Sequence, residues 1–137
     1  MEELEKIKAS AAEVVTKLRP VSKIDFGYNK QSVDWLEGYI ERLRKNGSFE
    51  SSKSQFIGMF GSYLGECIIH RYGGHWENRN GDLIISFDDQ NWILPFNRVR
   101  KQWENGLEDR IGLLFEMIPQ VWSKCTQTPG PSTQEQE

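Results

Sequence analysis

Residues 55–76 read QFIGMFGSYLGECIIHRYGGHW, and this stretch decides the fold. It predicts a helix from about Ser52 to Tyr72 that ends at Gly73-Gly74, because a glycine pair permits the left-handed turn at a helix end. Between Phe56 and Ile69 the segment carries one formal charge, Glu66. A helix with so little polar surface is expected at the centre of the protein, covered by other elements.

The helix has one bulky face and one nearly flat face. Glycine inside a helix costs about 1 kcal/mol relative to alanine, so a group of glycines on one side predicts that another backbone element packs closely there. A ligand groove on the flat side is the alternative, and self-association through it would give a homodimer. The bulky face carries Phe56, Phe60, Tyr63 and Cys67, and the flat face carries Gly58, Gly61, Ser62 and Gly65.

The segments before residue 52 predict two more helices. An amphipathic pattern covers Glu2 to Arg19, and Pro20 is expected to stop that helix. Ser32 is expected to cap the next helix, which Asn46-Gly47 ends.

After His75 the hydrophobic period changes to two, which is typical of strands. Asn80-Gly81 predicts a tight turn between two strands, and a third strand over residues 92–94 is closed by Pro95. Two helices should follow, over residues 97–104 and 108–123, the second kinked at Pro119.

These elements predict an α+β fold, in which a small three-stranded antiparallel β-meander packs against about four to five helices and the apolar, glycine-containing helix is central. Residues 1–20 should form an N-terminal amphipathic helix, residues 21–123 a single α+β domain and residues 124–137 a disordered tail, since the tail is polar and contains proline and glycine.

The composition excludes several classes of function. Seventeen basic and twenty acidic residues give a formal charge of -3, and the chain has no long basic run, so nucleic acid binding is disfavoured. No segment approaches the roughly twenty apolar residues of a membrane span, and the N-terminus lacks a signal-peptide pattern. Cys67 and Cys125 do not make a disulfide framework. We expect a cytoplasmic protein without a cofactor, as a monomer or homodimer.

Glu66 is the sharpest chemical clue, because a carboxylate on an apolar helix must be paired, protonated or placed at a site. Glu66 and His70 are four residues apart and could act as an acid/base pair. With His75 they could also face a zinc ion, but the chain has no specific metal motif. The favoured interpretation is a structural ion pair between Glu66 and a base of the following helix, with Arg98, Arg100 and Lys101 as candidates.

Five tryptophans are spread over the chain, and tryptophan is prominent in the hot spots of protein interfaces. Mixed charges between residues 98 and 109 could form the polar rim of a partner site. The residues expected to form a binding surface are Trp76, Trp92, Arg98, Lys101 and Glu108.

The segment FGSYLGECIIHRYGGHW, followed by WILPFNRVRKQWENGLEDRIGLLFEMIP, resembles a widespread family of small uncharacterised bacterial proteins with the pattern LGxxLGE, YGGxW and PFxxVxKQxxNGxED. The resemblance covers about residues 60–119 and implies a bacterial cytosolic domain without a transferable catalytic residue. Small acidic α+β proteins often neutralise toxins or bind other partners. We therefore expect a non-enzymatic protein-binding module, immunity-like or regulatory, with a small-ligand protein or enzyme using Glu66 and His70 as the alternative.

Overall fold

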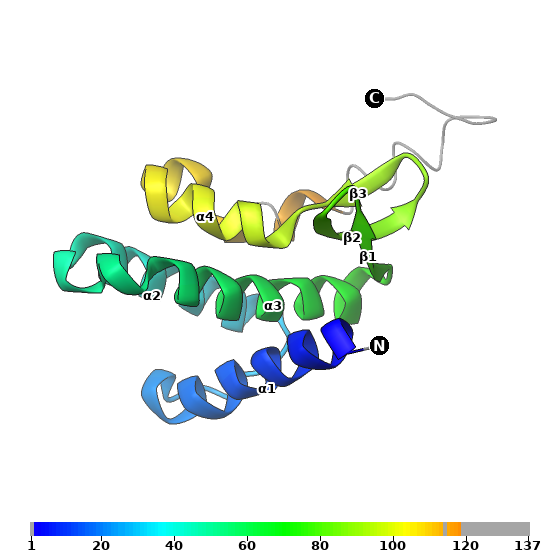
Figure 1. Cartoon of the computed structure of the whole chain (residues 1–137). Helices are drawn as coiled ribbons and strands as arrows, with labels where there is room; N and C mark the ends of the chain where they lie inside the picture. The colour runs from blue at the N-terminus through cyan, green and yellow to red at the C-terminus, as the bar shows by residue number, and fades with distance from the viewer. Residues whose placement is uncertain (1, 114, 119–137) are drawn as a thin grey trace.

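The computed structural model describes residues 2–113 and 115–118, and the fold is α+β. Helix α3 (Lys53–Tyr72) lies between α1 (Glu2–Ser22) and α4 (Pro95–Asn105), and packs against both (Figure 1). Helix α2 (Lys30–Lys45) packs against α4, and the sheet lies at the end of the bundle where α3 finishes (Figure 1). The central position predicted for the apolar helix is confirmed.

The ends of α3 and α2 follow from local signals. Gly73 caps α3 with φ +86°, a left-handed conformation that glycine adopts without strain. Asn46 ends α2 as predicted, and the short 3-10 helix η1 (Gly47–Ser52) links α2 to α3. The N-cap of α2 differs from the prediction. Asn29 accepts the Ser32 backbone N–H at 2.8 Å, and the buried Ser32 hydroxyl accepts the Gly27 N–H instead.

Helix α1 also differs from its predicted end, because it runs through Pro20 to Ser22. A proline lacks the N–H for one helical hydrogen bond and its ring crowds the carbonyl four residues earlier, but only Val21 and Ser22 of α1 follow Pro20, so little of the helix remains to be disrupted. Four apolar side chains of α1 are buried, and three of them belong to the main core cluster. The buried residues are Ile7, Ala11, Val14 and Leu18.

The predicted meander is confirmed. Strands β1 (His75–Arg79), β2 (Asp82–Asp88) and β3 (Asn91–Ile93) form one antiparallel sheet in the order β1-β2-β3. Asn80 and Gly81 join β1 to β2 with φ of 56° and 91°, as a tight hairpin requires. One face of the sheet, with Ile85 opposite both Trp76 and Ile93, turns toward the core cluster. The opposite face carries the paired residues His75, Ser86 and Trp92.

The flat face of α3 is covered at Gly61 and Gly65, as the grouped glycines predicted, and is open at Gly58. A Cβ atom on Gly65 would lie 2.2 Å from the indole of Trp76, and one on Gly61 would lie 2.3 Å from the ring of Phe96. The rings of Trp76 and Phe96 also touch each other, with centroids 5.8 Å apart. The glycines therefore hold the sheet and the start of α4 close against α3.

The predicted break between the last two helices is present, but the second helix begins later than predicted. Gly106, with φ +82°, ends α4, and residues Gly106–Asp109 form the 3-10 helix η2. The following helix begins at Ile111 rather than at Glu108, because Arg110 is extended. The predicted kink at Pro119 and the predicted tail over residues 124–137 lie outside the described residues.

The prediction on membrane spans agrees with the helices of the described part of the chain. None of them combines the length and the apolar character that crossing a bilayer needs.

Candidate functional site

Glu66 lies at the end of α3 nearest the sheet, where it is half-buried. Its Oε2 atom accepts a hydrogen bond of 2.7 Å from the indole N–H of Trp76. The ion pair that we expected with Arg98, Arg100 or Lys101 is wrong, since none of the ion pairs found within residues 2–113 and 115–118 involves Glu66. The YGGxW turn brings Trp76 back beside Gly65 and Glu66. The indole N–H of Trp76 therefore supplies the partner of the Glu66 carboxylate.

His70 is exposed and does not share a hydrogen bond with Glu66 in the described structure. Its ring meets the ring of Tyr28 edge-on, with centroids 4.6 Å apart. Burial, followed by the negative charge of Glu66, raises the pKa of Tyr28 above its ordinary value. Glu66 and His70 thus lie near each other but have different partners, a hydrogen bond for one and a ring contact for the other.

A metal site has no support among the described side chains, which contain no group of three His, Cys, Asp or Glu residues able to hold an ion. His75 lies 3.7 Å from the carboxylate of Glu77 on β1. Cys67 is fully buried, and burial raises the pKa of its thiol to about 12. Cys67 is therefore a core thiol, because a buried thiol with such a pKa is not a nucleophile near neutral pH.

The PFxxVxKQxxNGxED segment contains a buried polar network that the sequence analysis missed. Gln102 is fully buried, and its Nε2 donates to the Glu37 carbonyl and to Glu41 Oε2, both at 2.9 Å. Its Oε1 accepts the backbone N–H of Ile111 at 3.0 Å. Glu37 Oε1 in turn accepts the N–H of Gly112 at 3.0 Å. These side chains of α2 and α4 satisfy backbone donors at the start of the last helix, so the segment is structural.

The C-terminal end of α4 is held in a similar way. Arg44 Nε donates to the Trp103 carbonyl at 2.6 Å, and the guanidinium lies beside Gly106. A cation at the C-terminal end of a helix also complements the helix dipole. The NG dipeptide of the motif therefore ends a helix rather than forming a site.

The residues predicted to bind a partner occupy different places in the fold. Trp76 is held inside by Gly65 and Glu66, so it is not a free anchor. Lys101 and Glu108 are exposed, and the half-buried Arg98 has a buried Nε without a hydrogen-bond partner in the described part of the chain. Trp76 and Trp92 point to opposite faces of the sheet, since Trp76 pairs with Ile85 and Trp92 with Ser86.

Trp92 lies on the outer face of the sheet, on the edge strand β3, and 44% of it is exposed. The guanidinium of Arg79 lies over its ring, 4.6 Å from the centroid. Arg79 Nε also donates to Glu77 Oε2 at 2.8 Å, and this hydrogen bond lowers the pKa of Glu77. We call this cluster of Glu77, Arg79 and Trp92 the Trp92–Arg79 surface. Trp92 was predicted as a binding residue and Arg79 was not, although hairpin register places both on one face.

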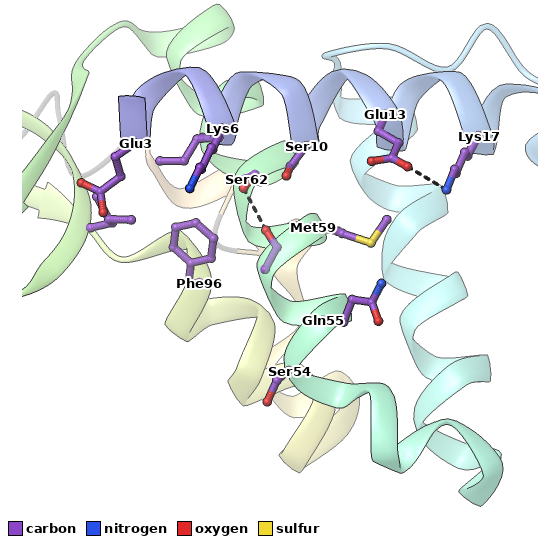
Figure 2. A pocket seen from close by; sticks show the side chains of 13 residues that line it. Glu3, Lys6, Ser10, Glu13, Lys17, Ser54, Gln55, Met59, Ser62 and Phe96 are labelled. Carbon is purple, nitrogen blue, oxygen red and sulfur yellow. Dashed lines mark hydrogen bonds and ion pairs between the residues drawn. The ribbon is translucent and has the colours of Figure 1, made fainter. Parts of the chain in front are cut away.

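A groove runs between α1 and α3 on the side of Gly58, with a volume of about 530 Å³. We call it the α1–α3 groove. Figure 2 shows the polar side chains of α1 along one wall and the side chains of α3 and Phe96 along the other. A Cβ on Gly58 would meet no atom within 4 Å, so the floor is open there. The groove is lined by Glu3, Lys6, Ile7, Ser10, Glu13, Lys17, Ser54, Gln55, Gly58, Met59, Ser62, Leu83 and Phe96.

Comparison of this chain with family models, with curated proteins and with solved structures finds no match. The family resemblance inferred from the sequence pattern therefore stays a prediction, and the function has to be argued from the side chains alone.

Proposed function

We propose that this protein is a non-enzymatic protein-binding module that uses the Trp92–Arg79 surface. The observation that carries the proposal is the exposed indole of Trp92, held under the guanidinium of Arg79. Tryptophan and arginine are the residues most enriched at the energetic centres of protein interfaces. A ring fixed by a cation–π contact also loses little conformational freedom on binding, which favours affinity.

The surroundings of Trp92 fit a partner site of this kind. Glu77 and Arg79 pair with each other, which leaves a polar rim of balanced charge around one apolar ring. Beneath the rim Ile84 and Ser86 are only 2% and 3% exposed, so the surface has a packed base. A partner that covers Trp92 would bury apolar area while Glu77 and Arg79 stay paired with each other.

The kind of role proposed is toxin neutralisation or regulation, by analogy with other small acidic α+β proteins, and the family resemblance suggests a bacterial cytoplasm as its place. The alternative, an enzyme or small-ligand protein based on Glu66 and His70, has less support. One oxygen of Glu66 already accepts the Trp76 N–H, and the α1–α3 groove is lined by neither residue.

Affinity capture from the organism that encodes the protein tests the proposal. The baits are the tagged wild type, Trp92→Ala and the matched control Leu107→Ala, which truncates another exposed apolar side chain outside the sheet. We expect wild type and Leu107→Ala to retain the same protein. Trp92→Ala should bind that protein about 30-fold more weakly, the loss of about 2 kcal/mol that is typical of a hot spot.

Equal retention by folded Trp92→Ala would refute the proposed surface. Glu66→Gln keeps the shape of the side chain and removes its charge, so it tests the alternative function based on Glu66 and His70. Loss of binding to a host metabolite in Glu66→Gln, with no protein retained by the wild type, would replace the proposal with the ligand-binding function.

A further inference from the structure

The wall of the α1–α3 groove formed by α1 is a regular polar stripe. Its members follow one another at steps of three, four, three and four residues, the spacing that keeps side chains on one face of a helix. The stripe runs beside the apolar stripe that α1 turns to the core, one residue out of step with it. Figure 2 shows the polar side chains in a row along the groove. The stripe consists of Glu3, Lys6, Ser10, Glu13 and Lys17.

The charges along this stripe alternate in sign and are arranged almost symmetrically about Ser10. Glu3 and Lys17 each lie seven residues from Ser10, which is about 10 Å along the helix. Lys6 and Glu13 lie four and three residues from it, again on opposite sides. A second, antiparallel copy of α1 centred on Ser10 would therefore place Glu3 against Lys17 and Lys6 against Glu13. A parallel copy would instead place like charges together.

The other wall and the floor of the groove bound an open space of about 530 Å³ beside the stripe. The floor at Gly58 is open, and Met59 is the bulky side chain next to it. The Ser62 hydroxyl donates to the Gly58 carbonyl at 2.8 Å, so covering Ser62 would leave no unsatisfied donor there. Lys17 Nζ pairs with Glu13 Oε2 at 2.7 Å within α1, and the two side chains are 64% and 51% exposed. An exposed pair of this kind contributes little to stability, so the charges of a partner can replace it at small cost.

We propose that the α1–α3 groove is the interface of a homodimer, in which α1 of each copy lies antiparallel to α1 of the other across a two-fold axis at Ser10. The surface is self-complementary, as a two-fold interface requires, because each acidic position of the stripe faces a basic one. The homodimer uses a different surface from the Trp92–Arg79 surface, so the two proposals stand or fall separately.

Sedimentation equilibrium of the full chain in low salt tests the proposal. Lys17→Glu should raise the dissociation constant of the dimer about ten-fold or more, because each dimer then loses two attractive contacts and gains two repulsive ones. Glu3→Lys should have the same effect. The double variant Glu3→Lys with Lys17→Glu should restore the dimer, since it exchanges the charges and keeps them complementary. Lys8→Glu, an equal charge change on an exposed residue of α1 outside the groove, is the control.

A second variant blocks the groove without a change of charge. Gly58→Gln places a side chain in the open floor, and the monomer should keep its circular dichroism spectrum while the dimer is lost. A wild type that stays monomeric at the highest soluble concentration would overturn the proposal and leave the groove to another occupant, such as a peptide. A dimer that tolerates Lys17→Glu as well as it tolerates Lys8→Glu would also overturn it.

Discussion

Replacing Gly65 with alanine tests the packing of the sheet against α3. The added Cβ would lie 2.2 Å from both Cη2 and Cζ2 of Trp76, far inside van der Waals contact. The indole cannot retreat freely, because its N–H is bonded to Glu66 and its ring lies against Phe96. The methyl group must therefore displace Trp76 from its site.

The change in the free energy of unfolding caused by Gly65→Ala is the sum of three contributions. Overpacking of this kind costs about 2 kcal/mol, and losing the hydrogen bond from Trp76 to the half-buried carboxylate of Glu66 costs about 1.5 kcal/mol. Alanine gains about 1 kcal/mol over glycine inside a helix. We expect Gly65→Ala to be less stable than the wild type by about 2.5 kcal/mol.

Urea unfolding of dilute protein, followed by far-ultraviolet circular dichroism, measures this difference. Gly58→Ala is the matched control, because it is the same substitution in the same helix at a position where nothing lies within 4 Å. It should be more stable than the wild type by about 1 kcal/mol. If Gly65→Ala proved as stable as Gly58→Ala, Trp76 could not occupy the site beside Gly65 and the reasoning would be refuted.

Three further predictions concern a buried amide, a thiol and a carboxylate. Gln102→Leu should lower the free energy of unfolding by about 3 kcal/mol, because the carboxylate of Glu41 and a helix N–H lose their buried partner; a loss below about 1 kcal/mol in urea unfolding would contradict the network. In a Cys125→Ser variant, a thiol reagent at about pH 8 should label Cys67 only in denaturant, because burial raises the pKa of this thiol to about 12; rapid labelling of the folded protein would show that the thiol is reachable. The folded-state pKa of Glu77 is lowered, so its stabilising contribution is present above the unfolded-state pKa of about 4.3 and is lost as pH falls through the folded value. Glu77→Gln should therefore lower the urea midpoint at about pH 6 and have no effect at about pH 2. An equal effect at both pH values would argue against the ion pair between Glu77 and Arg79.

Local signals predicted the main elements of the fold. Gly73-Gly74 ends α3 and Asn80-Gly81 makes the hairpin, because both depend on backbone conformations that glycine permits. The flat face of α3 likewise follows from helical spacing alone. The end of α1 was misjudged, since Pro20 breaks a helix interior but is tolerated in a last turn.

The partners of polar side chains could not be predicted in the same way. Glu66 was expected to need a basic residue because it lies on an apolar helix, yet the indole of Trp76 satisfies it after the chain has turned through the glycine pair. Gln102 meets α2 across more than 60 residues of sequence, and no local pattern encodes such a pairing. The N-cap of α2 was wrongly predicted for another reason. Asn29 and Ser32 are both good capping residues, and burial of Ser32 decides between them.

The hydrogen bond from the Ile111 N–H to Gln102 has a consequence for how the protein opens. Helix ends normally exchange their amide hydrogens with solvent by fraying, without disturbing the rest of the fold. Here the Ile111 N–H is bonded to Gln102 of α4, whose amide is bonded in turn to α2, and the next amide, Gly112, is bonded to Glu37 of α2, so we expect this helix start to open together with both segments. These segments therefore form one cooperative unit, and the amide hydrogen of Ile111 should exchange as slowly as those in the middle of α3.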